Sequence, residues 1–151
     1  MEIRRAAASD IQTIADFNAA MALETEEVAL DGERVSAGVE ALIRDASKGF
    51  YLVAEIDGRV VGQMMLTYEW SDWRNGTFWW IQSVYVRPEN RRGGVYRAMY
   101  AHAVDLAKQQ RACGLRLYVE RENAIARRTY EDLGMSRTVY DMYEVDFVPS
   151  R

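Results

Sequence analysis

The sequence predicts one domain of mixed α/β (α+β) type, in which a central mixed sheet is flanked by helices. Three observations lead to this prediction. Two strand-forming runs, over 50–56 and 59–69, flank Asp57-Gly58, a strong signal for a two-residue hairpin turn. A run of aromatic and β-branched residues over 79–87 predicts a buried strand, which Pro88 ends. Apolar residues then recur at helical spacing from Val95 onward.

The first part of the chain predicts a short strand followed by two helices. The strand covers residues 2–5, and Ser9 with Asp10 offers a cap for the helix that follows. An acidic turn around residues 24–27 ends this helix. A second helix is expected over 33–48, with Gly49 as its stop.

The rest of the chain predicts both antiparallel and parallel pairing. The expected strands cover 50–56, 59–69, 79–87, 115–120 and 136–147, with one helix from Val95 to about Arg111 and a short one capped by Asn123. Three strands follow one another directly, so they pair antiparallel, whereas strand-helix-strand steps imply parallel pairing. The predicted order is β-α-α-β-β-β-α-β-α-β.

Composition, charge and cysteine content limit the classes of function. The 151 residues, 49% hydrophobic and 28% charged, suit a single domain over 1–151. A net charge of -4 and a pI near 5.1 argue against broad nucleic-acid binding and favour a cationic partner. We expect no signal peptide and no membrane partner, because no apolar run is long enough. The single Cys113 allows no internal disulfide, which predicts the cytoplasm, and no spacing of His, Cys and carboxylates predicts a metal site.

The segment between the buried strand and the following helix predicts an anion site. It reads Arg91-Arg92-Gly93-Gly94, and the helix begins at Val95. Glycines let the backbone approach a ligand, and the N–H groups and dipole of a helix N-terminus favour negative charge. Short Arg/Gly turns also occur for purely structural reasons, so the loop alone leaves both interpretations open.

This loop resembles the Arg/Gln-x-x-Gly-x-Gly/Ala pyrophosphate loop of the GCN5-related N-acetyltransferase (GNAT) family. Arg91 and Gly94 occupy its first two defining positions, whereas Tyr96 stands where the family has a small residue. Residues 123–135 are similar to the family's Asn-x-x-Ala-x-x-x-Tyr-x-x-x-Gly-Phe segment, with Met135 in place of Phe. The predicted order of elements also matches the family over nearly the whole chain. The resemblance implies an N-acetyltransferase that takes its acetyl group from acetyl-CoA.

The resemblance also implies which residues contact acetyl-CoA. The cofactor would lie in a V-shaped opening where the strand containing Val84, Tyr85 and Val86 parts from the strand over 115–120. Backbone groups of Val84 and Val86 would pair with the pantetheine, and a strand N–H would polarise the thioester carbonyl. In part these valines are also ordinary sheet core. The other implied contacts are Arg91, Arg92, Gly93, Gly94, Val95, Tyr96, Asn123 and Tyr130.

Tyr130 resembles the residue that donates a proton to the departing CoA thiolate. A thiol pKa near ~8.5 against ~10 for tyrosine makes full proton transfer uphill by roughly 2 kcal/mol, so hydrogen-bond donation is the better description. Tyr130 shares a helical face with Ala126 and Leu133, so a packed tyrosine is the alternative. Asn123 could equally be only a helix N-cap.

The general base is not evident from the motifs. An alkylamine with a pKa near ~10.4 must lose a proton before it attacks, which costs roughly 4 to 5 kcal/mol at pH 7. Many relatives use a strand glutamate, but the corresponding positions here are Gln82 and Tyr118. The catalytic candidates are instead Glu24 and Glu26, directly or through water, with a solvated surface as the alternative for both.

Aromatic and acidic residues near the central strand predict the acceptor site. Trp70 and Trp73 with Glu69 and Asp72 could hold an organic cation by stacking and charge, and Gln82 could orient the amine or a water. Exposed tryptophans could equally form a dimer surface. Because family members often dimerise, the resemblance leaves a homodimer open.

Three functions follow from this sequence. The favoured one is acetyl transfer to the primary amine of a small cationic molecule, by direct attack in a ternary complex. The second is acetylation of a protein lysine or N-terminus. The third is a non-catalytic acyl-CoA-binding regulatory domain, which the missing strand glutamates allow.

Overall fold

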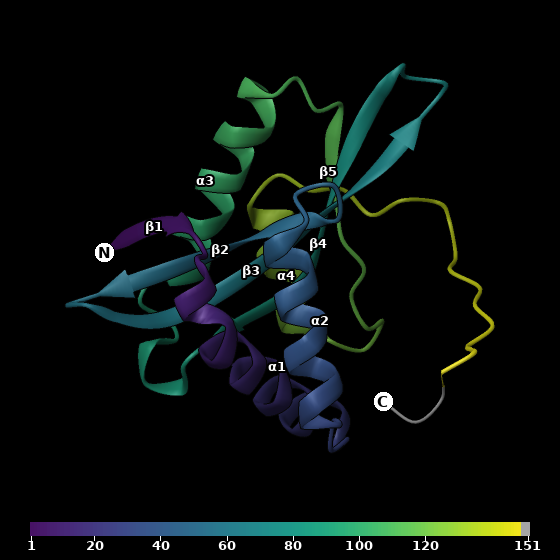
Figure 1. Ribbon diagram of the computed structural model, residues 1–151. Coiled ribbons are helices and arrows are strands. Elements are labelled where there is room, and N and C mark those ends of the chain that lie inside the picture. Colours follow the sequence, from purple (N-terminus) through teal and green to yellow (C-terminus); the bar gives the residue numbers. More distant parts are fainter. Residues whose placement is uncertain (149–151) are drawn as a thin grey trace. The chain divides into compact units, whose positions relative to one another are not determined.

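The computed structural model describes residues 1–148 and divides the chain into two compact units, Met1–Leu117 and a second that begins at Tyr118. The first unit contains β1 (Glu2–Arg5), α1 (Ile11–Glu26), α2 (Gly32–Arg44), β2 (Gly49–Ile56), β3 (Arg59–Ser71), β4 (Gly76–Val86), α3 (Val95–Gln109) and β5 (Gly114–Arg116) (Figure 1). The second unit contains α4 (Ala124–Asp132). No helix within residues 1–148 is both long and apolar enough to cross a bilayer.

The strands form one mixed sheet in the order β1-β2-β3-β4-β5. Neighbouring strands from β1 to β4 are antiparallel, and β5 runs parallel to β4. Asp57 and Gly58 have φ angles of 50° and 74°, which a two-residue hairpin turn requires at its two central positions. The predicted mixed sheet and its first hairpin are therefore confirmed.

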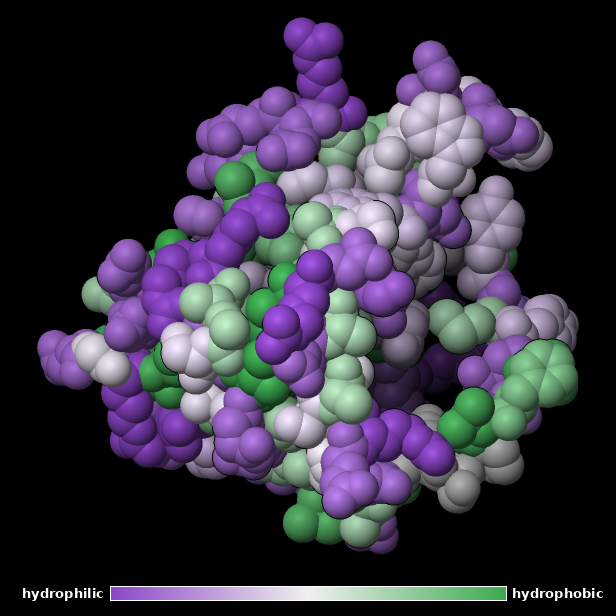
Figure 2. Space-filling view, viewed as in Figure 1, coloured by the Kyte–Doolittle hydropathy of each residue, from purple (hydrophilic) through white to green (hydrophobic). Residues whose placement is uncertain are grey.

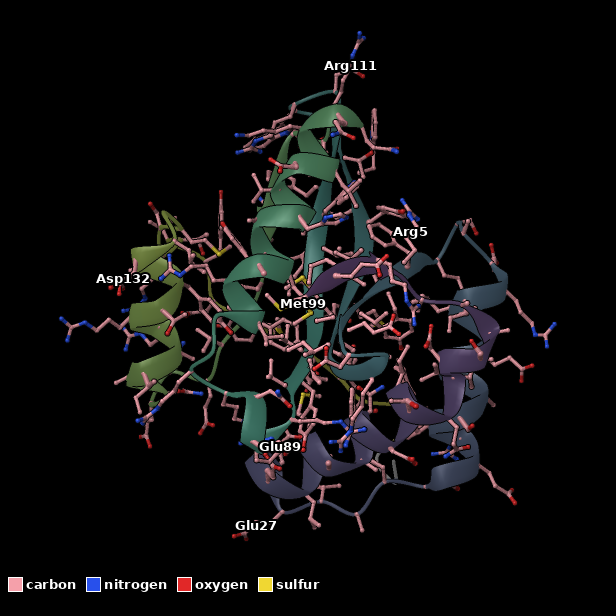
Figure 3. All side chains as sticks on the ribbon, turned by 90° about the vertical axis from the view of Figure 1, so that its left-hand side faces the viewer. Arg5, Glu27, Glu89, Met99, Arg111 and Asp132 are labelled. Atoms are coloured by element: carbon pink, nitrogen blue, oxygen red, sulfur yellow. The ribbon has the colours of Figure 1, made fainter. Side chains whose placement is uncertain are left out.

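Helices cover both faces of the sheet. On one face, Met99 of α3 is fully buried and points toward the strands (Figure 3). On the other face, Ile14 of α1 and Val39 of α2 pack with Tyr51 and Val53 of β2. The two apolar layers exclude water from both sides of β2 and β3, and this burial is the main source of stability for the unit.

The strand β4 is irregular at Gln82, one of the residues predicted to bind the acceptor. Its register with β3 shifts between Met64 and Leu66, so that Gln82 and Ser83 both lie opposite Met65. Two residues opposite one form a β-bulge, which bends the strand. On its other side β4 pairs with β5 over Phe78–Trp80 only. Within Met1–Leu117, the edge of β4 beyond Trp80 has no strand partner.

Some predicted bounds are wrong. The strand expected over 115–120 is the shorter β5, and the second helix ends at Arg44 rather than residue 48. Asp10 does not cap α1 with its side chain, because its carboxylate instead binds Arg4 and the Ala7 N–H. The cap predicted at Asn123 is confirmed, since its Oδ1 accepts the Ala126 N–H at 3.1 Å.

The final strand predicted over 136–147 is wrong. The structure forms no strand over these residues, and Val139, Tyr143 and Phe147 are 94%, 94% and 87% exposed. Alternation and β-propensity are local signals, whereas a strand also needs a neighbouring backbone to hydrogen-bond with. No strand within residues 1–148 pairs with this segment, so the order of elements ends at α4.

Candidate active site

The free edge of β4 exposes backbone groups of alternate residues. The Arg87 N–H donates to the Val61 carbonyl at 2.8 Å, which makes Gly62 and Val86 a non-hydrogen-bonded pair of the antiparallel ladder. The N–H and C=O of Val86 therefore point away from β3, toward the edge that β5 leaves open. Val84, two residues earlier and opposite Met64, has the same orientation. This edge can accept an extended ligand as an added strand.

The loop after β4 leads directly into the N-terminus of α3. Arg92 and Gly94 both have left-handed backbone conformations, with φ angles of 64° and 82°, and residues 91–94 are exposed. Among the described residues no side chain caps α3 at Gly94, so its first N–H groups lack a capping oxygen. Such an N-terminus next to arginines is suited to a phosphate group.

Arg91 folds back over the edge of β4. Its Nε donates to the Val86 carbonyl oxygen at 2.9 Å, and its Nη2 lies 2.7 Å from Oε2 of Glu24. The guanidinium also lies over the Tyr85 ring, 5.4 Å from its centroid. The Arg91 side chain thus connects the loop after β4, the open edge of β4 and the last turn of α1.

Glu24 and Tyr85 form the other half of this cluster. The Tyr85 hydroxyl donates to Oε1 of Glu24 at 3.3 Å, and the Tyr85 ring packs 4.9 Å from the ring of Phe17 in α1. Burial raises the pKa of the Tyr85 phenol, and the nearby Glu24 carboxylate raises it further, so Tyr85 is a neutral hydrogen-bond donor at neutral pH. The sequence indicated Tyr85 only through its strand and did not predict this side-chain contact.

The two glutamates proposed from the sequence differ in position. Glu24 reaches β4, whereas Glu26 is exposed at the end of α1 and has no ion pair within residues 1–148. Glu27, just beyond α1, and Glu89, just after β4, lie at the same end of the first unit, opposite Arg111 (Figure 3). The end of α1 and the loop after β4 are therefore neighbours, and of the two glutamates the structure brings only Glu24 to this loop.

The residues predicted to bind the acceptor lie mostly along the β3–β4 hairpin. Trp70 and Trp73 are 63% and 88% exposed, and the hairpin tip carries large pale side chains in Figure 2. Trp70 lies opposite Thr77, and Gln82 is five residues further along β4, which separates them by about 17 Å at a rise of ~3.4 Å per residue. The structure therefore places these tryptophans apart from Gln82.

The polar members of that set already have partners. Glu69 forms an ion pair with Arg116 at 2.5 Å, and Asp72 accepts the Trp73 N–H. Gln82, in the bulge, donates to Oγ1 of Thr67 at 2.6 Å. Their role in binding an acceptor stays a prediction.

The hairpin also borders a cavity. It has a volume of about 470 Å³ and lies between β3, β4 and the end of α3. Its lining residues are Tyr68, Trp70, Asn75, Gly76, Thr77, Trp79, Gln110, Arg111 and Ala112. None of the residues in contact with Arg91 lines it, so the cavity is distinct from the cluster at the end of β4.

A buried polar group in β3 is not among the site residues predicted from the sequence. The Gln63 side chain is fully buried and donates to Oδ1 of Asn18 in α1 at 3.0 Å, while Asn18 also hydrogen-bonds the buried Tyr51. The side-chain carbonyl oxygen of Gln63, Oε1, has no hydrogen-bond partner among the described residues. The sequence feature that could have indicated this buried contact is a glutamine within an otherwise mostly apolar strand. This network fixes α1 on the sheet close to Tyr85, which lies opposite Gln63.

The second unit contains the other motif. Asn123 caps α4, and Tyr130 lies half-buried on the same helix, within its own unit. The alternative reading of Asn123 as an N-cap is therefore confirmed, while its contact with CoA stays a prediction. No group of three or more His, Cys, Asp or Glu side chains within residues 1–148 could hold a metal ion.

Comparison with known proteins identifies the family. Residues 15–135 match the model of the Acetyltransferase (GNAT) family. The crystal structure of a possible acetyltransferase from Clostridium difficile 630 is 47% identical, with a TM-score of 0.90 over 96% of each chain. No curated protein matches the chain.

More distant structures share the fold. One is a ribosomal-protein-alanine N-acetyltransferase from Brucella melitensis biovar Abortus 2308, with 20% identity and a TM-score of 0.79 over 97% of this chain and 100% of that one. Another is the aminoglycoside N-acetyltransferase AAC(6')-Iy in complex with CoA, with 14% identity and a TM-score of 0.75 over 96% and 98%. The family match and the 47% identical structure together establish that this chain belongs to the GNAT acetyltransferase family.

Proposed function

We propose that the chain is an acetyl-CoA:amine N-acetyltransferase whose acceptor is the primary amine of a small cationic molecule. One observation carries the proposal: the open edge of β4 ends at an arginine-glycine loop and an uncapped helix N-terminus, and the Glu24 carboxylate reaches the same place. The edge suits an extended amide chain, the loop suits a diphosphate, and the carboxylate suits a cation.

The residues present fit acetyl-CoA, which supplies a thioester whose acyl group can pass to an amine. Val84 and Val86 would pair with the pantetheine through backbone groups, and residues from Arg91 to Tyr96 would hold the diphosphate. The left-handed Gly94 carries no Cβ, so the backbone at the start of α3 stays open to an anion. An N–H on the free edge would polarise the thioester carbonyl.

Two side chains would handle protons. Glu24 would hold the ammonium group of the acceptor and take its proton, so that the amine nitrogen can attack the acetyl carbon. As the carbon–sulfur bond breaks, Tyr130 would donate a hydrogen bond to the leaving sulfur. The proton that remains on the attacking nitrogen then passes to the thiolate or to water, which leaves a neutral amide.

The class of acceptor is the part of this proposal that most needs a test. The acidic chain and the Glu24 carboxylate support a small cation. The fold is shared with an enzyme named for ribosomal-protein alanine and with one named for aminoglycosides, so it is compatible with protein and small-molecule acceptors. Acetylation of a protein is therefore the alternative.

A competition assay separates these classes. The protein would be incubated with acetyl-CoA and equal amine concentrations of a polyamine, an aminoglycoside and a lysine peptide, and the acetylated products would be counted by mass spectrometry. We expect a free amine to dominate. Predominant acetylation of the peptide would replace the small-molecule proposal with the protein one.

A further inference from the structure

Arg91 occupies two groups that the proposed reaction needs. Its Nε holds the Val86 carbonyl oxygen at 2.9 Å, and its Nη2 holds the Glu24 carboxylate at 2.7 Å. Tyr85 contacts both members of this ion pair. Its ring lies against the Arg91 guanidinium, and its hydroxyl donates to the other carboxylate oxygen of Glu24. Each carboxylate oxygen of Glu24 therefore has a hydrogen-bond partner in this state.

The Val86 carbonyl is the point where cofactor and arginine compete. It faces the open edge of β4, where an amide N–H of the pantetheine would donate. The Val86 carbonyl oxygen has a second lone pair, but the guanidinium and an added strand would approach it from the same open side of β4. Binding of the pantetheine along this edge therefore favours displacement of Arg91.

A diphosphate offers Arg91 another anion. Arg91 begins the loop that leads to the N-terminus of α3, and its side chain is 44% exposed, so it can turn without unpacking a core. Guanidinium groups bind phosphate oxygens through two N–H groups at once, at least as well as they bind a carboxylate. The exposed ion pair with Glu24 is weak enough to be exchanged.

We propose that Arg91 is a latch that couples cofactor binding to the release of Glu24. When acetyl-CoA binds, the guanidinium leaves Val86 and Glu24 for the diphosphate, and the freed carboxylate then faces the acceptor amine. This inference rests on the proposed function, and adds to it that the Glu24 carboxylate becomes available only after Arg91 has left it.

The test measures acetyl-CoA binding by calorimetry, which requires no turnover. In Glu24→Gln the ion pair is lost, so Arg91 is released and acetyl-CoA binds about two- to five-fold tighter. Glu27→Gln is the matched control, because Glu27 lies three residues further on, is exposed and has no ion pair within residues 1–148. It should leave the affinity unchanged.

A double-mutant cycle separates the latch from the general effect of removing a negative charge. In an Arg91→Gln background no guanidinium is left to release, so Glu24→Gln should no longer tighten binding, whereas a general charge effect would persist. Unchanged or weaker binding in the single Glu24→Gln variant would overturn the latch. Absence of acetyl-CoA binding by the unmodified protein would overturn the proposed function itself, and the latch with it.

Discussion

The proposed chemistry gives proton-handling roles to two side chains, Glu24 and Tyr130. Glu24 is held by defined partners, and its role can be tested through them. Tyr130 is assigned through the motif in α4, so its test must come from the reaction.

Replacing Tyr130 with phenylalanine removes the hydroxyl and keeps the ring. If the phenol donates a hydrogen bond to the leaving thiolate, we expect the rate of thiol release to fall about 100-fold, with little change in acetyl-CoA affinity, because the loss of one donor to developing negative charge costs about this much. Steady-state assays of thiol release measure both quantities. Tyr140→Phe, at an exposed tyrosine of the same unit, is the control. An unchanged rate in Tyr130→Phe would remove Tyr130 from the mechanism.

Asp10 allows a prediction for stability against pH. Its buried carboxylate binds the Arg4 guanidinium at 2.8 and 3.1 Å and accepts the Ala7 N–H, and these contacts lower its pKa from the ordinary 3.8. A lowered pKa in the folded state means that the contribution to stability is present above pH 3.8 and is lost as the pH falls through the folded value. Asp10→Asn should therefore lower the free energy of unfolding by about 1 to 3 kcal/mol at pH 7.

Urea unfolding at pH 7 and at pH 3 measures this difference. The gap between Asp10→Asn and the unmodified protein should narrow at pH 3, and the exposed Asp16→Asn should change little at either pH. A gap of the same size at both values would show that packing, and not charge, accounts for the effect.

At the scale of elements, β4 and the start of α3 build the proposed cofactor site, and Gly94 joins them. A methyl group at Gly94 meets no atom within 4 Å, but the φ of 82° strains any L residue. Gly58, in the β2–β3 turn, has a φ of 74° and equally open surroundings. Both alanine variants should lose about 1 kcal/mol of stability, yet only Gly94→Ala should weaken acetyl-CoA binding.

Thermal unfolding and calorimetric titration of the two variants test this prediction. Equal binding by Gly94→Ala and Gly58→Ala would mean that the backbone at Gly94 is not approached by the ligand. A larger loss of binding in Gly58→Ala would contradict the assignment of the site to this loop.

The sequence predicted the elements whose signals are local. Residues close together in the sequence determine three of these elements. They are the Asp57-Gly58 turn, the strand 79–87 and the helix after Gly94. The strand predicted over 136–147 does not form. A strand needs a neighbouring backbone to hydrogen-bond with, and the pattern of side chains within one segment does not show whether such a neighbour exists. The sequence predicted the residues of the cluster at the end of β4 but not their contacts. Glu24 and Arg91 stood out by type, but their ion pair joins residues 67 positions apart and appears only once α1 has packed on the sheet.

At the scale of the whole molecule, the chain combines opposite charges for two ligands. Its net charge is -4, yet the end of β4 and the start of α3 carry Arg87, Arg91, Arg92 and Arg97. A local basic segment suits an anionic cofactor, while the acidic remainder attracts a cationic amine over longer distances. The charge distribution thus agrees with two substrates of opposite sign.

We propose that this chain moves an acetyl group from acetyl-CoA to an amine. The most direct test of this proposal is thiol release from acetyl-CoA across polyamines, aminoglycosides, amino acids and lysine peptides, with the acetylated product measured in parallel. We expect thiol release that requires an acceptor, matches the acetylated product in amount and is fastest with a small cationic amine. Saturable acetyl-CoA binding without release for any acceptor would contradict the proposal and favour a non-catalytic acyl-CoA-binding domain.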